Sequence, residues 1–210
     1  MYIKTKEIAG FIPALHGMRS PMNSWHLNDS TMYIGNELTG EEMIYIGPND
    51  MDLAQRLIKA GPEHYKFLRQ IQVWADFNMP LYWWSEFDSY KFNSKNSCST
   101  MHKLLNAKKE IELSDFVYDE DQENMLQAVI NVLNGYRKCY LLSKDYSYVI
   151  KAKRLLPTSY KQLRTVNTNY AELRNIYFQR KNHRLKEEWQ DTFCKWVESL
   201  PYAKELILYK

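Results

Sequence analysis

The side chains best suited to chemistry are basic and hydroxyl groups, and they gather in a few segments. The polar segment S-Y-K-F-N-S-K-N-S-C-S-T-M runs from Ser89 to Met101 and contains Lys91 and Ser99. Further along the chain, K-R-L-L-P covers 153–157 and F-Q-R ends at Arg180. Fixed cations beside hydroxyl groups bind phosphate and other anionic oxygens. This pattern favours an anionic small molecule as the ligand.

Common catalytic signatures are absent from the sequence. There is no G-x-G-x-x-G, P-loop, G-x-S-x-G or H-E-x-x-H segment. Cys98 and His102 lie four residues apart, and His64 or His16 could join them around a metal, but no second cysteine pair supports this. A Cys98 nucleophile with a histidine base lacks a third group to orient it. We predict no metal site.

Charge and cysteine content narrow the class of protein. The net charge is +3 and no run of five basic residues occurs, so we expect no nucleic-acid polymer as partner. Three widely spaced cysteines do not form a disulfide framework, which indicates a reducing compartment. We find no signal peptide and no apolar window that could span a membrane. The expected location is the cytoplasm, away from membranes.

The first half of the chain predicts a strand and two helices that could carry these groups. Residues 1–48 are expected to form short strands and loops. Asn49 or Asp50 can cap a helix over 51–60, with Leu53, Leu57 and Ile58 inward and Gly61 at its end. Residues 71–77 alternate as a half-buried strand. Pro80 suits the first position of a helix to about Ser89, and 93–100 is expected to be a loop.

The second half is predicted to be mostly helical. Helices are expected at about 122–143, 146–153, 167–181 and 184–198, followed by an apolar tail at 206–209. In the first of them we expect Met125, Val129, Val132 and Leu133 to face inward. A length of 210 residues without repeats or a linker favours a single α+β domain over 1–210.

An ordered set of segments resembles the flavin-dependent thymidylate synthases, a family with the hallmark R-H-R-x-x-S-x-N-E-x-S-x-R. The resemblance runs from about Leu57 to about Trp189, and leaves 1–50 unmatched as an N-terminal extension or lid. Placing Pro80 on the family's proline aligns the hallmark, without a gap, with Ser89 to Met101. The matching positions are Lys91 (a conservative match), Ser94, Asn96 and Ser99. The departures are Ser89, Tyr90, Ser97 and Met101.

The resemblance implies a set of binding residues. His64 and Asn167 in T-V-N fall on flavin contacts, although a two-residue insertion is then needed between T-V-N and Arg180. Lys153 or Arg154 falls on a nucleotide-phosphate arginine, and Arg180 on an arginine that reaches the pyrimidine. By this analogy Arg180 and Ser99 are the catalytic candidates. The cofactor candidates are His64, Arg69, Lys91, Asn96 and Asn167, and the substrate candidates are Ser97, Ser99, Lys153, Arg154, Arg180 and Arg19.

Members of this family are homotetramers whose sites form where subunits meet. The resemblance therefore implies an α+β fold with an antiparallel or mixed sheet packed with several helices, and an FAD cofactor. It also implies NADPH and methylenetetrahydrofolate as co-substrates and C5-methylation of dUMP or a related pyrimidine nucleotide. Trp83, Trp84 and Tyr90 are candidate walls for the flavin, and for the two tryptophans a core position is the alternative that we favour.

The departures from the hallmark leave alternatives open. Ser89 and Met101 replace two arginines, and losing two charge-assisted contacts of about 1.5–3 kcal/mol each weakens nucleotide binding about a hundredfold or more. Arg19, in the unmatched segment G-M-R-S-P-M-N-S-W, is our candidate substitute. The alternatives are a relative with a changed nucleotide or chemistry, such as base hydroxymethylation, and a non-catalytic nucleotide-binding or assembly protein.

Overall fold

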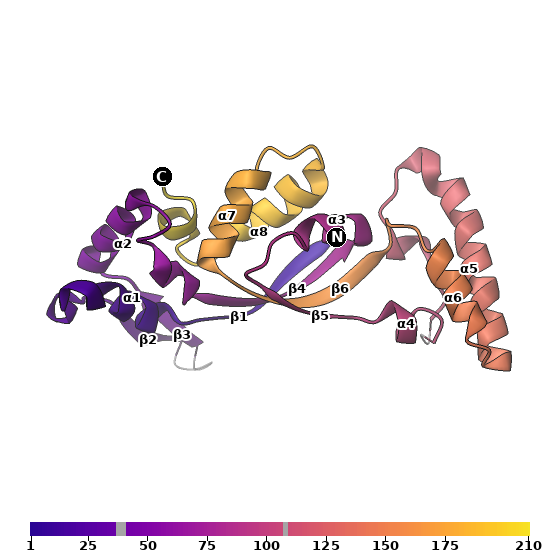
Figure 1. Ribbon diagram of the computed structural model, residues 1–210, viewed down its shortest axis with the longest axis horizontal. Coiled ribbons are helices and arrows are strands. Elements are labelled where there is room, and N and C mark those ends of the chain that lie inside the picture. The colour runs from indigo at the N-terminus through magenta and orange to yellow at the C-terminus, as the bar shows by residue number, and fades with distance from the viewer. Residues whose placement is uncertain (37–40, 107–108) are drawn as a thin grey trace. The chain divides into compact units, whose positions relative to one another are not determined.

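The computed structural model describes residues 1–36, 41–106 and 109–210 (Figure 1). Its internal contacts cluster into two compact units, which are described separately below. Unit 1 comprises 1–2, 76–89 and 95–165, and unit 2 comprises 3–75, 90–94 and 166–210. The chain starts in unit 1 and enters unit 2 after Tyr2. It passes into unit 1 after Ala75, returns to unit 2 for 90–94, and leaves unit 1 for the last time after Thr165.

Strands and helices both contribute to the chain, which confirms the predicted α+β class. One sheet has four strands in the order β1-β4-β6-β5, and β2 pairs antiparallel with β3 in a second sheet. The strands are β1 (Tyr2–Ala9), β2 (Thr31–Asn36), β3 (Glu41–Tyr45), β4 (Gln72–Pro80), β5 (Ser94–Ser97) and β6 (Lys161–Asn169). The α-helices are α1 (Phe11–Arg19), α2 (Pro48–Ala60), α3 (Leu81–Phe87), α4 (Thr100–Lys103), α5 (Glu123–Ser143), α6 (Ser147–Leu155), α7 (Tyr170–Arg180) and α8 (Lys195–Glu198).

The strand predicted over 71–77 is confirmed as β4, which runs on to Pro80. Its side chains alternate between buried and half-buried, because successive residues of a strand point to opposite faces. Pro80 then precedes α3 as its N-cap, one position before the predicted place. Two predictions nearby were wrong. The polar stretch 93–100 contains β5, and T-V-N at 165–167 lies in β6, so the helix predicted from 167 begins at Tyr170.

In unit 1, α5 and α6 form a helix pair around a small apolar core (Figure 1). Both helices were predicted close to their observed bounds. Of the residues predicted to face inward on α5, Leu133 is buried and Val129 packs against the core, but Met125 and Val132 were predicted wrongly. Leu126, Ile130 and Leu133 are buried, whereas Met125 and Val132 are 77% and 45% exposed. Apolar residues lie on two sides of α5, so their spacing alone did not identify the side that is buried.

In unit 2, the helix predicted over 51–60 is confirmed as α2, and it ends at Gly61 as expected. Gly61 has φ of 110°, a conformation that glycine adopts without steric cost. The predicted capping residues were wrong. Gly47 is the N-cap, and Asp29, from the preceding segment, accepts the backbone N–H of Asn49 at 2.8 Å and of Asp50 at 3.0 Å. The residues expected to be short strands and loops also include the helix α1.

The C-terminal part of unit 2 is largely π-helical. The segments Lys186–Cys194 and Ala203–Ile207 are π-helices, and α8 lies between them. Their apolar side chains, among them Trp189, Phe193 and Val197, are fully buried. The tail predicted from its apolar composition is thus part of a core, where Leu206 and Ile207 are also buried.

The three cysteines differ in burial, and we therefore expect their thiols to differ in reactivity. Cys194 is 4% exposed and burial raises the pKa of its thiol to about 12, whereas Cys98 and Cys139 are exposed. The thiolate is the reactive form. We expect two thiols per chain to react with a chromogenic disulfide reagent at pH 8, and the third only after unfolding in guanidinium. Rapid reaction of all three in the folded protein would contradict the burial of Cys194.

Within the described residues, no helix is both long enough and apolar enough to span a bilayer.

Candidate functional site

A hollow of about 290 Å³ in unit 2 combines a cation, an exposed ring and several amides. The junction between β6 and α7 forms one wall of it. Asn169 ends β6 and its Oδ1 accepts the backbone N–H of Glu172 at 3.0 Å, which starts α7. The lining residues are Pro62, Tyr65, Arg69, Phe92, Asn169, Ala171, Glu172 and Asn175.

Phe92 is held at this hollow through its backbone. Its N–H donates to Glu172 Oε1 and its carbonyl accepts from Asn169 Nδ2, both at 3.4 Å. Its ring is 67% exposed, and the Arg69 guanidinium lies 5.9 Å from the ring centroid. An exposed aromatic face beside a cation suits a planar, anionic ligand.

Arg69 supplies the positive charge of this hollow. It is exposed and forms no ion pair with any residue that the structure describes. Its backbone carbonyl accepts Gln72 Nε2 at 2.7 Å, and Gln72 Oε1 accepts Asn167 Nδ2 at 3.2 Å. Two predicted cofactor residues, Arg69 and Asn167, are therefore connected through Gln72, which the sequence analysis did not single out.

Arg180 lies in an aromatic cluster at the end of α7. Its Nε donates to the Tyr90 hydroxyl at 2.8 Å, and its guanidinium lies 4.6 Å from the Trp189 ring centroid. The Tyr90 hydroxyl in turn donates to Gln179 Oε1 at 3.1 Å. Arg180 is thus held in one orientation. Tyr90, a candidate flavin wall, is buried and contacts this arginine instead of presenting an open face.

His64 and Lys91 lie outside the Arg69 hollow in unit 2. His64 is exposed and lines a separate, more apolar hollow of about 450 Å³, together with Met22, Leu53 and Leu57. Lys91 is exposed between Tyr90 and Phe92. The structure therefore does not bring His64 together with Arg69 and Asn167 in one pocket of unit 2.

Arg19, our candidate for a replacement nucleotide contact, is 3% exposed. Its Nε pairs with Asp50 Oδ1 at 2.6 Å, inside unit 2. Asp50 also accepts the Ser30 hydroxyl at 2.6 Å. This placement argues against a nucleotide contact, because the charge of Arg19 is already balanced by a buried carboxylate.

In unit 1, Ser99 lines a hollow of about 200 Å³ with several basic side chains. Ser99 caps α4, its Oγ accepting the backbone N–H of His102 at 3.3 Å. Lys103, Lys109 and Lys161 line the same hollow, and of these Lys109 pairs with Asp115 at 3.0 Å. Burial, aided by the Asp115 carboxylate, raises the pKa of Tyr160 to about 12, so this hydroxyl stays protonated. Asn96 and Ser97 lie nearby in sequence, exposed on β5.

Lys153 and Arg154 lie in another hollow of unit 1, of about 280 Å³. Both are exposed on α6, and the other lining residues are Met101 and Ile150. Met101 replaces the last arginine of the family hallmark. Two cations therefore lie beside Met101, the position that the resemblance aligns with the last arginine of the hallmark.

Trp83 and Trp84 are core residues, as favoured from the sequence. Their exposed fractions are 0% and 1%, and both contact the rings of Phe77 and Phe87. Trp84 Nε1 donates to the Gln162 carbonyl at 3.0 Å. Neither indole presents a face to a ligand.

Of the Arg69 hollow and its support, only Arg69 and Asn167 were predicted from the sequence, and the residues that were not predicted include Gln72, Phe92, Asn169 and Glu172. One signal was available. Asn169 followed by Glu172 has the spacing of a helix N-terminus, and it marks where β6 changes into α7. Across the described ranges, no group of three or more histidine, cysteine and carboxylate side chains is arranged to hold a metal ion.

Comparison with solved structures identifies the fold. The chain is similar to the flavin-dependent thymidylate synthase ThyX from Helicobacter pylori complexed with FAD and dUMP, with a TM-score of 0.72 and 19% identity. The match covers 100% of this chain and 98% of the other. A second structure of the same enzyme with FAD and dUMP, at 2.31 Å resolution, gives the same TM-score and identity over 99% and 97%. No protein-family model and no curated protein sequence matches the chain. The chain therefore has the flavin-dependent thymidylate synthase fold.

Proposed function

We propose that this protein binds FAD and a pyrimidine nucleotide and methylates dUMP at C5, with methylenetetrahydrofolate as carbon donor and NADPH as reductant. The observation that carries the proposal is the Arg69–Phe92–Asn169 hollow in a chain with this fold. The similar enzyme was crystallised with FAD and dUMP. A cation that forms no ion pair with the described residues, an exposed ring and fixed amides are the groups that an anionic aromatic cofactor needs.

Asn169 replaces Asn167 in our assignment of the flavin asparagine. The sequence alignment needed a two-residue insertion between T-V-N and Arg180, and moving the asparagine from 167 to 169 removes it. Asn169 also lines the hollow, whereas Asn167 supports it through Gln72. We assign Asn169 to the cofactor and keep Asn167 as a positioning residue.

The hollow accommodates only part of a dinucleotide. Its volume of about 290 Å³ lies at the lower limit of ordinary ligand pockets, roughly 300–1,000 Å³. We therefore propose that residues of a neighbouring subunit complete the site, in a homotetramer like those of the family that the chain resembles. Bound flavin would supply the redox chemistry and take part in carbon transfer.

The chain's own residues act by binding and orientation. Arg180, held by Tyr90 and stacked near Trp189, has a fixed guanidinium that can polarise a pyrimidine carbonyl. Ser99, with Lys103 and Lys161 in the same hollow, offers hydroxyl and ammonium donors to a phosphate. Lys153 and Arg154 add cations beside Met101.

A second candidate function is favoured by the departures at Ser89, Ser97 and Met101. Each of them replaces a charged residue of the family hallmark, so a different pyrimidine nucleotide, or a changed reaction such as hydroxymethylation, would require different contacts. Lys153 and Arg154 supply positive charge beside Met101, but they do so from α6 and do not reproduce the position of an arginine at 101.

An absorbance spectrum from 300 to 550 nm tests both candidates. We expect the purified protein to show flavin bands, or to gain them after incubation with FAD and desalting. We also expect these bands to shift when dUMP is added. Bands that respond to another pyrimidine nucleotide but not to dUMP would favour the second candidate. A protein that retains no flavin under any of these conditions would rule out both.

A further inference from the structure

The helix α5 has a second row of apolar and small residues, on the side opposite its buried face. The buried face consists of Leu126, Ile130 and Leu133. The second row, which we call the α5 seam, is exposed throughout, with Leu142 at 88% and Met125 at 77%. The residues of the α5 seam are Met125, Ala128, Val132, Gly135, Cys139 and Leu142.

The spacing of the α5 seam is that of a helix-pairing surface. Its members alternate between steps of three and four residues, the heptad repeat with which two helices pack along their length. An outward face of a helix is normally polar. Gly135 is a second sign of a pairing surface. A glycine inside a helix reduces helix stability, and no neighbour in the chain requires one here, because nothing lies within 4 Å of the position that its Cβ would take. Small residues on a helix surface allow another backbone to approach closely.

We propose that the α5 seam pairs with the α5 seam of a second copy of this chain, antiparallel, about a two-fold axis between Val132 and Gly135. This inference rests on unit 1 alone and does not depend on the proposed function. A two-fold interface uses the same surface of both copies, so the surface must be complementary to itself.

The side-chain sizes of the α5 seam meet that requirement in the antiparallel direction. The axis places Val132 opposite Gly135 of the second copy, so that the larger side chain fills the space left by the glycine. It places Ala128 opposite Cys139, and Met125 opposite Leu142 at each end. A parallel pair would instead place glycine opposite glycine and valine opposite valine. The glycines would leave a cavity, and the valines beside them would be crowded.

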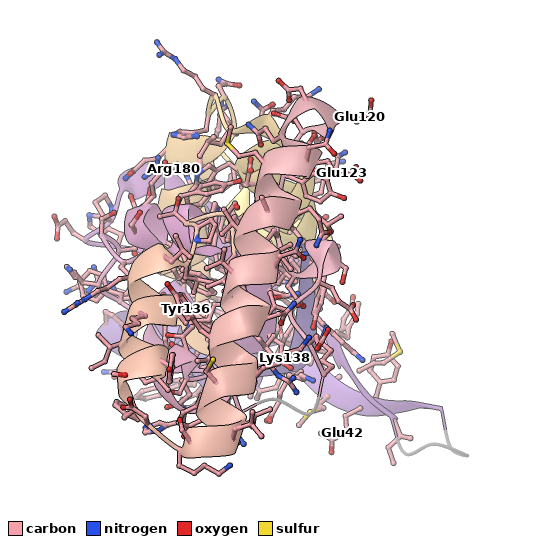
Figure 2. All side chains as sticks on the ribbon, turned by 90° about the vertical axis from the view of Figure 1, so that its right-hand side faces the viewer. Glu42, Glu120, Glu123, Tyr136, Lys138 and Arg180 are labelled. Carbon is pink, nitrogen blue, oxygen red and sulfur yellow. The ribbon has the colours of Figure 1, made fainter. Side chains whose placement is uncertain are left out.

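The charges on α5 favour the same direction. Glu120, Asp121 and Glu123 lie at or just before its first turn, whereas Lys138 and Lys144 lie in or just after its last two turns. Figure 2 shows Glu120 and Glu123 at one end of the helix and Lys138 toward the other. The antiparallel axis brings the acidic first turn of each α5 to the level of the basic last turns of the other. A parallel pair would place acidic ends together, which is unfavourable.

A hollow at one end of the α5 seam provides space for the partner. It measures about 250 Å³ and is lined mainly by apolar groups, including Met125, Leu126, Val129 and Pro157. The proposed axis brings the exposed Leu142 of the second copy to Met125, beside this hollow. Each copy would contribute one such leucine and one such hollow.

Disulfide trapping tests the direction of pairing. In a Cys98→Ser background, Cys139 is the only exposed cysteine that remains. Adding Ala128→Cys places a thiol opposite Cys139 of the second copy. We expect mild oxidation to give a covalent dimer whose peptide map contains a 128–139 link, and no covalent dimer from the Cys98→Ser protein alone. Links joining 128 to 128 or 139 to 139, or no covalent dimer at all, would overturn the proposal.

Sedimentation of two matched variants tests the interface itself. Ala128→Glu places a charge in the α5 seam, and Gln127→Glu places the same charge one residue away, outside it. We expect the first to halve the mass of the assembly at micromolar concentration, and to weaken association about 100-fold, because it buries an unpaired charge. The second should leave the mass unchanged, and both should keep the circular dichroism of the parent. A parent protein that sediments as a single chain, or an Ala128→Glu protein that keeps the mass of the parent, would refute the pairing.

Discussion

Replacing Arg19 by Met will lower the free energy of unfolding by about 3–5 kcal/mol, because it leaves the Asp50 carboxylate buried without its cation. The exposed fractions of the two side chains are 3% and 0%, so water cannot take over the role of the guanidinium. Urea unfolding, followed by circular dichroism, measures the change. A loss below about 1 kcal/mol would show that the pair is not buried as described.

The control for this prediction is Arg56→Met. Arg56 pairs with Asp52 at 2.9 Å on the same unit, but both side chains are about two thirds exposed. Such exposed pairs contribute about 0–1 kcal/mol to the free energy of unfolding, so we expect Arg56→Met to lower it by no more than that. The double variant Arg19→Met/Asp50→Leu should recover much of the lost stability, because it removes the unpaired charge as well. The free energies of unfolding lost in Arg19→Met and in Asp50→Leu should therefore not add up in the double variant. If they did add up, the two residues would not be coupled.

Replacing Arg69 by Ala will weaken flavin binding about 10- to 100-fold. A charge-assisted contact to an anionic oxygen contributes about 1.5–3 kcal/mol, and each 1.4 kcal/mol is a factor of ten in affinity. Arg69 is exposed in its hollow and its side chain forms no ion pair within the described ranges, so its removal leaves no buried charge in the folded chain. The change should therefore affect the ligand and leave stability nearly unchanged. Titration of the apoprotein with FAD, followed by flavin fluorescence, gives the dissociation constant.

Arg56→Ala is again the matched control, since it removes one exposed arginine of unit 2 that does not line the hollow. Its dissociation constant for FAD should match that of the parent. Equal affinities in the Arg69→Ala and parent proteins would place the flavin elsewhere, without affecting the proposal that the protein binds flavin. A parent protein that binds no FAD would remove the proposal itself.

Much of the secondary structure follows from local sequence. The alternation of 71–77 predicted β4, and the apolar spacing of 122–143 and 146–153 predicted α5 and α6 to within about two residues. Gly61 ended α2 as expected, because a positive φ is a property of the single residue. The ordered segments from His64 to Arg180 also led to the fold, which the full-length structural match bears out.

Contacts between residues far apart in the sequence determined the surroundings of individual side chains, which local sequence did not predict. Arg19 became a structural residue because Asp50 lies beside it in the folded chain, and nothing near Arg19 in the sequence indicated that. Phe92 lines the proposed flavin hollow because Asn169 and Glu172 hold its backbone from about 80 residues away. The inward face of α5 was ambiguous because the helix has two apolar sides, and only packing against α6 and its neighbours determined which is buried. Local propensity thus determined the type and approximate place of most elements, whereas contacts between distant residues set several of their ends and determined which side chains remain exposed.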